Sequence, residues 1–152
     1  MHPIRNCETT VDKILGLRAR ELRAGKPVDS ARFPEDQHPH TLHFAAFTGD
    51  RVVGCLTLIR TSGGGTPSWQ LRGMATDKAW QNKGIGKNLL TCAEERLRNL
   101  VSEQPGASDA RIWCNARTGA VPFYEHLGYK KVSDEFMIEK IGPHYKMEKK
   151  IL

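Results

Sequence analysis

Two stretches of the chain repeat apolar residues at the spacing of an amphipathic helix. The first follows Thr9 and Thr10, either of which can cap a helix, and it stops at Gly25 and Pro27. Its apolar positions are Val11, Ile14, Leu15, Leu17 and Leu22. The second is longer, and its apolar positions are Ile85, Leu89, Leu90, Ala93, Leu97 and Leu100. Charged residues fill the remaining positions, so each stretch is predicted to bury one face.

Between these helices the pattern changes to that of strands. Residues 41–48 and 51–60 are rich in β-branched and aromatic side chains, and they flank Gly49 and Asp50. A glycine in a two-residue connection favours a tight hairpin turn. A glycine-rich loop at 61–68 then leads into a third strand at 69–76.

The rest of the chain is divided into shorter elements. Ile4 and Arg5 belong to a short opening strand, residues 28–40 form a loop, and residues 110–115 form a further strand. Residues 118–128 form a short helix that ends at a glycine. The tail holds two apolar runs, YKKV and HYKMEKKIL, with a turn between them at Gly142 and Pro143. Strands and helices in this order, β-α-(α)-β-β-β-α-β-α-β-β, predict an α/β fold of mixed α+β character in one domain, residues 1–152.

Composition narrows the class of protein. The chain has 152 residues, of which 39% are apolar and 26% charged, as in ordinary globular proteins. No apolar stretch approaches the roughly 20 residues of a membrane span, and the N-terminus lacks the apolar core of a signal peptide. The four cysteines are scattered, without metal-ligand spacing. We therefore expect free thiols in the cytoplasm, no metal site and no membrane partner.

The charge balance favours an anionic partner. Lys and Arg number 23 against 17 Asp and Glu, a formal charge of +6. Nucleic acid and a polyphosphorylated cofactor both fit such a balance. The basic residues are dispersed and form no nucleic-acid-binding motif, so nucleic acid is the remote alternative.

The segment QNKGIG, residues 81–86, leads from a strand into the longest helix. The free N–H groups and positive dipole of a helix start suit a phosphate. Gly84 and Gly86 let a ligand approach the backbone, and Lys83 and Lys87 add positive charge. The spacing fits neither a Walker loop nor a dinucleotide fingerprint. From spacing alone, the segment is either an anion site or a tight strand–helix turn.

Two motifs carry a family resemblance. LRGMATDKAWQNKGIGKNLL resembles the cofactor motif of the GNAT acetyltransferases, Q/R-x-x-G-x-G/A, with Gln81, Gly84 and Gly86 on its fixed positions. AVPFYEHLGYKKV resembles the later A-x-x-x-Y-E-x-L-G-F/Y segment of the same family. The predicted order of elements also matches the family's scheme. The resemblance implies a single GNAT domain with a central, mostly antiparallel mixed sheet flanked by helices.

The resemblance also implies an activity. A GNAT enzyme moves acetyl from acetyl-CoA to a primary amine of a small molecule or peptide, directly, in a ternary complex. It implies cofactor contacts from the end of the third long strand and from the glycine segment, which are Met74, Ala75, Thr76, Gln81, Asn82, Lys83, Gly84, Ile85, Gly86 and Lys87. Many members carry asparagine three residues before the alanine that is Ala120 here. That position is Arg117, and Asn115 lies two places earlier. Either could reach the cofactor, and Arg117 could equally bind an acidic acceptor.

Catalytic roles follow from the same motifs. Tyr124 occupies the position of the tyrosine that protonates the departing thiolate in many members; the alternative is a packed aromatic residue. IGPHYKM resembles the I-P-H-x-x-M ending of some bacterial members, which makes His144 the first candidate for the base. The alternative for His144 is a surface residue on a strand. Weaker candidates for the base are Glu139, Glu21 and His43.

The acceptor side is predicted only in outline. Arg72 is a charged residue within an apolar strand, so it lies on a solvated face or lines a pocket. With Trp69 and Trp113 it could form a pocket for an acidic or polar acceptor beside an aromatic wall. Three arginines of the first helix, Arg18, Arg20 and Arg23, could face the same groove or form a solvated face.

Two further expectations concern function and assembly. A non-catalytic acyl-CoA-binding sensor would keep the glycine segment without working acid and base groups, and it is the main alternative to an enzyme. Dimers are common in the family, so a second copy of the chain is a candidate partner.

Overall fold

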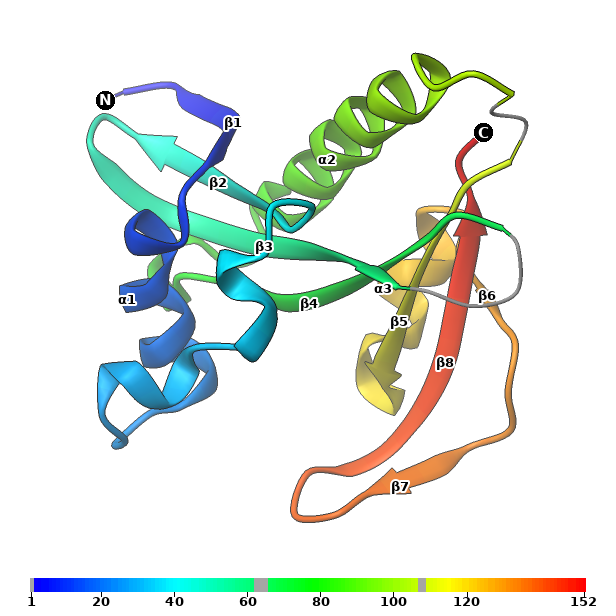
Figure 1. The fold of residues 1–152 in the computed structure, drawn as a ribbon. Coiled ribbons are helices and arrows are strands. Elements are labelled where there is room, and N and C mark those ends of the chain that lie inside the picture. Colours follow the sequence, from blue (N-terminus) through cyan, green and yellow to red (C-terminus); the bar gives the residue numbers. More distant parts are fainter. Residues whose placement is uncertain (1, 62–65, 107–108) are drawn as a thin grey trace.

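The computed structural model describes residues 2–61, 66–106 and 109–152. Its strands form one sheet in the order β1-β2-β3-β4-β5-β8-β6, with β7 paired to β8 (Figure 1). The strands are β1 (Ile4–Thr9), β2 (Leu42–Thr48), β3 (Arg51–Thr61), β4 (Ser68–Thr76), β5 (Arg111–Arg117), β6 (Lys130–Lys131), β7 (Phe136–Ile138) and β8 (Gly142–Lys150). The helices are α1 (Val11–Leu22), α2 (Ile85–Ser102) and α3 (Val121–His126), with short 3-10 turns η1 (Val28–Ala31), η2 (Pro34–Gln37), η3 (Lys78–Trp80) and η4 (Thr118–Ala120).

The predicted hairpin is confirmed. β2 and β3 pair antiparallel, and Gly49 takes the positive φ of 59° that the turn requires. Every strand pair is antiparallel except β4 and β5, which α2 connects as a crossover. The predicted class, a mixed and mostly antiparallel sheet flanked by helices, is therefore confirmed.

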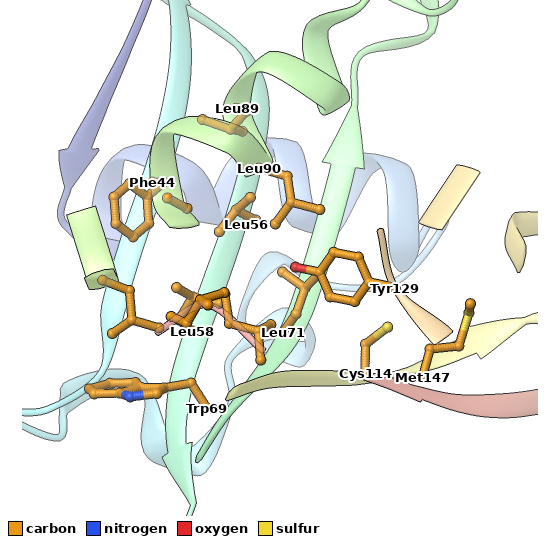
Figure 2. Packing of buried hydrophobic residues seen from close by; sticks show 14 of the residues in the cluster. Phe44, Leu56, Leu58, Trp69, Leu71, Leu89, Leu90, Cys114, Tyr129 and Met147 are labelled. Atoms are coloured by element: carbon orange, nitrogen blue, oxygen red, sulfur yellow. The ribbon is translucent and has the colours of Figure 1, made fainter. Parts of the chain in front are cut away.

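The two faces of the sheet carry separate apolar cores. α2 covers one face, where Leu89, Leu90 and Leu97 pack with Phe44 and other strand residues (Figure 2). α1 covers the opposite face, where Ile14 and Leu17 pack with residues of β2, β3 and β4. These residues alternate along the strands with those of the first core. Alternating side chains of one strand thus reach opposite helices, because successive residues of a strand point to opposite faces.

β4 and β5 separate beyond their first residues. Their parallel pairing covers only Ser68–Gln70 against Arg111–Trp113. Further along, β4 contains a bulge at Gly73, where φ is +62° and the register against β3 shifts. The strands therefore open toward their carboxyl ends, and this opening holds the candidate site.

Several details of the fold differ from the sequence prediction. β7 was not predicted, because three residues on an edge give too short a pattern to recognise. Gly142 and Pro143 begin β8 instead of forming the turn, and the turn lies between β7 and β8. Leu22 is exposed and does not belong to the buried face of α1. In the described parts of the chain, no helix combines the length and the apolar character needed to cross a bilayer.

Candidate active site

The first cavity lies between the end of β4, the glycine segment and α3. It has a volume of about 650 Å³, and its walls include Thr76, Gln81, Gly84 and Tyr124. α2 begins after Gly84, whose φ is 78°, and no side chain caps this end. The first backbone N–H groups of α2 therefore have no partner within the helix, and they carry the positive end of its dipole. This end of the cavity is suited to bind an anion.

Several contacts fix the glycine segment in place. The Gln81 side chain donates to the Thr76 carbonyl over 3.3 Å. Asp77 accepts from the Ala79 N–H at 2.9 Å and pairs with Arg51 at 3.0 Å. These two interactions lower the pKa of Asp77, the Ala79 hydrogen bond more than Arg51. The loop is thus tied to the strand that precedes it.

Gly54 of β3 allows α2 to begin where it does. A Cβ at Gly54 would lie 2.8 Å from Cγ2 of Ile85, the first residue of α2. Real Cβ atoms do not approach so closely, so with any larger residue the Ile85 side chain or the start of the helix would have to shift. The close approach of the start of α2 to β3 therefore relies on a glycine at this position.

Most predicted cofactor residues line the first cavity. They are Met74, Ala75, Thr76, Gln81, Asn82, Gly84, Ile85, Gly86 and Lys87. Lys83 does not line it, so Lys87 supplies the side-chain charge there. Trp80, Ala120 and Phe123 also line the cavity and were missed. All three lie within or next to the two family motifs in the sequence, and this proximity could have identified them.

A second cavity lies on the α1 side of the opening, with a volume of about 500 Å³. Side chains from β4, β5, β8 and the η2 region surround it, among them Arg72, Arg117, His144 and Phe33. Asn115 and Arg117 were predicted as cofactor contacts, with an acidic acceptor as the alternative for Arg117, and they line this cavity and not the first. The odd-numbered residues of β5 point to this face because side chains alternate along a strand.

Three residues line both cavities: Met74, Ala120 and Tyr124. The Tyr124 hydroxyl lies 3.9 Å from Sδ of Met74. Burial is the main cause that raises the pKa of Tyr124 above its usual value, and neighbouring Cys114 adds to it. The phenol is protonated at neutral pH, as an ordinary tyrosine is, and its burial makes it a weaker acid.

His144 lies on the wall of the second cavity, on β8. It is buried, and its Nδ1 lies 2.8 Å from the Gly142 carbonyl oxygen. In the neutral ring, Nδ1–H then donates to that carbonyl and Nε2 keeps its lone pair. The residue has the geometry of a proton acceptor facing the cavity.

Cys114 belongs to the lining of the second cavity, although its side chain, at an even-numbered position of β5, packs in the core on the α2 face. It is buried beside Tyr124, and burial raises its pKa to about 12. The thiol is therefore almost entirely protonated at neutral pH. Cys114 is therefore poorly suited to attack a thioester.

The predicted aromatic wall of the acceptor pocket is wrong. Trp69 lies in the core on the α2 face, opposite to Arg72, because the two positions differ by an odd number of residues (Figure 2). Trp113 shares the face of Arg72, but it does not line the cavity. Its indole N–H donates to Thr61 at 3.2 Å, and Lys146 lies over its ring. Phe33, from a segment read as loop, supplies the aromatic surface instead.

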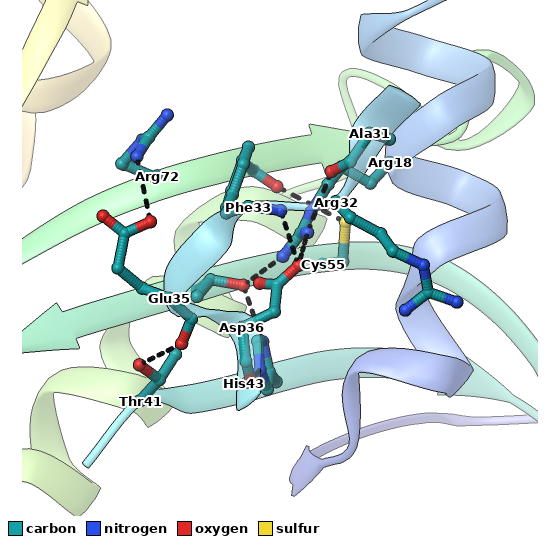
Figure 3. Close-up of polar contacts among 12 residues, drawn as sticks. Arg18, Ala31, Arg32, Phe33, Glu35, Asp36, Thr41, His43, Cys55 and Arg72 are labelled. Carbon is teal, nitrogen blue, oxygen red and sulfur yellow. Dashed lines mark hydrogen bonds and ion pairs between the residues drawn. The ribbon is translucent and has the colours of Figure 1, made fainter. Parts of the chain in front are cut away.

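A buried polar network removes two other candidates (Figure 3). Arg18 is 1% exposed and donates to Asp36 at 2.8 Å and to Thr57 at 2.7 Å. His43 contacts Thr57 through Nδ1 and the Asp36 carbonyl through Nε2, so both ring nitrogens are occupied. Arg18 is thus neither in the groove nor solvated, and His43 is not placed to act as a base. Glu21 and Glu139 line neither cavity.

The comparisons with known proteins agree on one family. A family model described as an acetyltransferase (GNAT) domain matches residues 25–151. The uncharacterised N-acetyltransferase YitI of Bacillus subtilis is 26% identical over 143 residues, which is 92% of this chain and 91% of that protein. An aminoglycoside 6'-N-acetyltransferase complexed with coenzyme A has a TM-score of 0.76 at 19% identity, over 97% of each chain. An acyl-CoA N-acyltransferase from Pseudomonas aeruginosa has a TM-score of 0.75 at 15% identity, over 97% of this chain and 99% of that one.

The mixed sheet that opens between β4 and β5 thus has the overall fold of solved N-acyltransferases. The chain belongs to the GNAT acetyltransferase family. It is accordingly an acyltransferase, and acetyl-CoA is its acyl donor.

Proposed function

We propose that the chain transfers the acetyl group of acetyl-CoA to a primary amine within a ternary complex. The observation that carries this proposal is that Met74, Ala120 and Tyr124 belong to the walls of both cavities. A donor in the first cavity and an acceptor in the second would meet at these residues. Direct transfer needs such a meeting point, because two reactants held in contact react as if they were parts of one molecule.

The first cavity would hold the cofactor. The free N–H groups at the start of α2 and the Lys87 side chain suit the pyrophosphate. The pantetheine arm would then run along Met74–Thr76 toward Tyr124. The bulge at Gly73 supports this path, because an irregular strand leaves backbone groups without a partner in the sheet.

The second cavity would hold the amine, with His144 as the base. Nε2 of His144 takes a proton from the ammonium, and the amine lone pair then attacks the thioester carbonyl carbon. The carbon–sulfur bond breaks with its electron pair on sulfur. Tyr124 gives its phenolic proton to that sulfur, which leaves free CoA. The new amide nitrogen still carries one extra proton, and its transfer to the Tyr124 phenolate gives the neutral amide and restores the phenol.

A covalent route through Cys114 is the catalytic alternative. It would form an acetyl-cysteine before the amine binds. The raised pKa of the thiol, about 12, opposes this route because thiolate is the reactive form.

The free cysteines of the structure also fit a reducing compartment, and we propose the cytoplasm.

The test is a panel of primary amines with acetyl-CoA, read by released thiol and by the mass of the acetylated amine. Acceptor-dependent thiol release supports the proposal. Tight CoA binding without release from any amine would support the non-catalytic sensor instead.

A further inference from the structure

The second cavity is cationic. Arg72 and Arg117 line it, whereas no Asp or Glu of the described residues does. Arg72 lies 3.8 Å from Glu35, which is outside the lining, so this ion pair is loose (Figure 3). Arg117 has no ion-pair partner within 4.0 Å in the described ranges. Even with Glu35 counted, the two arginines leave the walls with a positive charge.

Apolar side chains lie beside these arginines. Phe33 packs under the guanidinium of Arg72, with 4.3 Å from the ring centroid to the central carbon. The peptide N–H of Phe33 donates to Asp36 at 2.8 Å, so the buried network holds the ring in place. Leu22 and Ile141 also line the cavity, and they are 41% and 54% exposed. Large apolar side chains so exposed at a cavity commonly mark a surface that a ligand covers.

We propose that the acceptor is an amine that also carries a carboxylate and an apolar group. This inference rests on the proposed function and names its substrate class. The carboxylate binds Arg72 and Arg117, and the apolar group covers Phe33, Leu22 and Ile141. Arginine suits this role because its planar guanidinium group can donate two parallel hydrogen bonds to one carboxylate. A polycationic acceptor is disfavoured because like charges repel.

The register of the sheet places the two ends of such an acceptor. Arg117 on β5 lies directly opposite His144 on β8. Residues opposite each other in an antiparallel pair point to the same face, with their Cβ atoms about 5 Å apart. A carboxylate bound at Arg117 therefore leaves an amine a few bonds away close to His144. Apolar amino acids and short apolar peptides with a free carboxylate have this arrangement.

The experiment uses acceptors matched except for charge. Leucine is compared with leucinamide, and leucyl-leucine is compared with leucyl-leucinamide. Spermidine and an aminoglycoside serve as polycationic acceptors. The readouts are kcat/KM from released thiol, the mass of the product, and the Kd for CoA. We expect each free acid to exceed its amide by about 10-fold or more, as a charged hydrogen bond provides.

Variants test whether the arginines cause the preference. Arg117→Gln and Arg72→Gln should each lower kcat/KM for the acids about 10- to 100-fold and leave the amides and the Kd for CoA nearly unchanged. Arg117→Lys should keep part of the preference because it keeps the charge. Arg96→Gln is the matched control, since Arg96 lies on α2 and pairs with Glu8 away from both cavities.

The outcomes separate the two proposals. Amides or polycations that react as well as the acids overturn this inference, and so do arginine variants that slow acids and amides equally. In both cases thiol release still occurs and the proposed function stands. If no amine releases thiol while CoA binds, the proposed function itself fails.

Discussion

The Tyr124 hydroxyl lies 3.9 Å from Sδ of Met74, at the place where the walls of the two cavities coincide. Tyr124 comes from α3 and Met74 from the end of β4, next to the bulge. The two elements meet there because β4 and β5 are paired only at their other end. The proposed proton donor is thus placed by the opening of the sheet.

We predict that Tyr124→Phe lowers kcat about 100-fold or more and leaves the Kd for CoA and the melting temperature nearly unchanged. The change removes only the hydroxyl that would protonate the leaving sulfur. Steady-state kinetics and calorimetry measure the three quantities. A variant with wild-type kcat would remove Tyr124 from the mechanism.

Lys87 and Lys83 form a matched pair for cofactor binding. Both are exposed lysines of the same segment, but only Lys87 lines the first cavity. Lys87→Gln should weaken CoA binding about 2- to 5-fold at low salt, the range of an exposed charge pair, and the effect should shrink as salt is added. Lys83→Gln should change the Kd by less. Equal effects of both substitutions would contradict the assignment.

We predict that Gly54→Ala destabilises the protein by about 1–3 kcal/mol, the usual cost of overpacking. Its Cβ would lie 2.8 Å from the Ile85 side chain, so that side chain or the start of α2 must shift. A shift of the helix start should weaken CoA binding, measured by titration. Gly16→Ala is the control, because a Cβ there meets nothing within 4 Å. An unchanged Kd in folded Gly54→Ala would show that the helix start tolerates the shift.

The buried ion pair gives a stability prediction. Arg18→Met should cost about 3–5 kcal/mol, because it leaves the Asp36 carboxylate buried without its cation. Arg23→Met, at the exposed end of the same helix, should cost little. Adding Asp36→Leu to Arg18→Met should recover part of the loss. Denaturant unfolding measures all three, and a double variant less stable than Arg18→Met would contradict the reasoning.

Asp77 gives a prediction about pH. Its folded-state pKa is lowered, so ionised Asp77 contributes stability above its unfolded pKa of about 4. That contribution is lost as the pH falls through the lower folded-state pKa. The difference in unfolding free energy between wild type and Asp77→Asn should therefore shrink from about pH 5 downward. Asp50→Asn, in the exposed hairpin turn, provides the comparison; a difference for Asp77→Asn that does not change with pH would contradict the expectation.

Most residues that line the first cavity were predictable from sequence. A helix start with two glycines needs only local information, because the N–H groups belong to consecutive residues. The hairpin at Gly49 was predictable for the same reason. His144 was singled out through its motif and lines the second cavity, and its role as the base stays a prediction.

The acceptor side was not predictable, because it depends on distant pairings. Trp69 and Arg72 are three positions apart on β4, so they point to opposite faces of the sheet. Only the pairing of β4 with its neighbouring strands decides that Trp69 points into the core and Arg72 into the second cavity. Arg18 belongs to a run of helix charges, which usually remains solvated. Its burial follows from Asp36, Thr57 and Ala31, which approach it from three other segments. No local pattern brings these groups together.

A crystal structure with bound CoA tests the central claim most directly. We predict the pyrophosphate against the backbone N–H groups that open α2, and the sulfur beside the Tyr124 hydroxyl at the junction of the two cavities. CoA bound elsewhere, or a sulfur that cannot be reached from the second cavity, would contradict direct transfer between them.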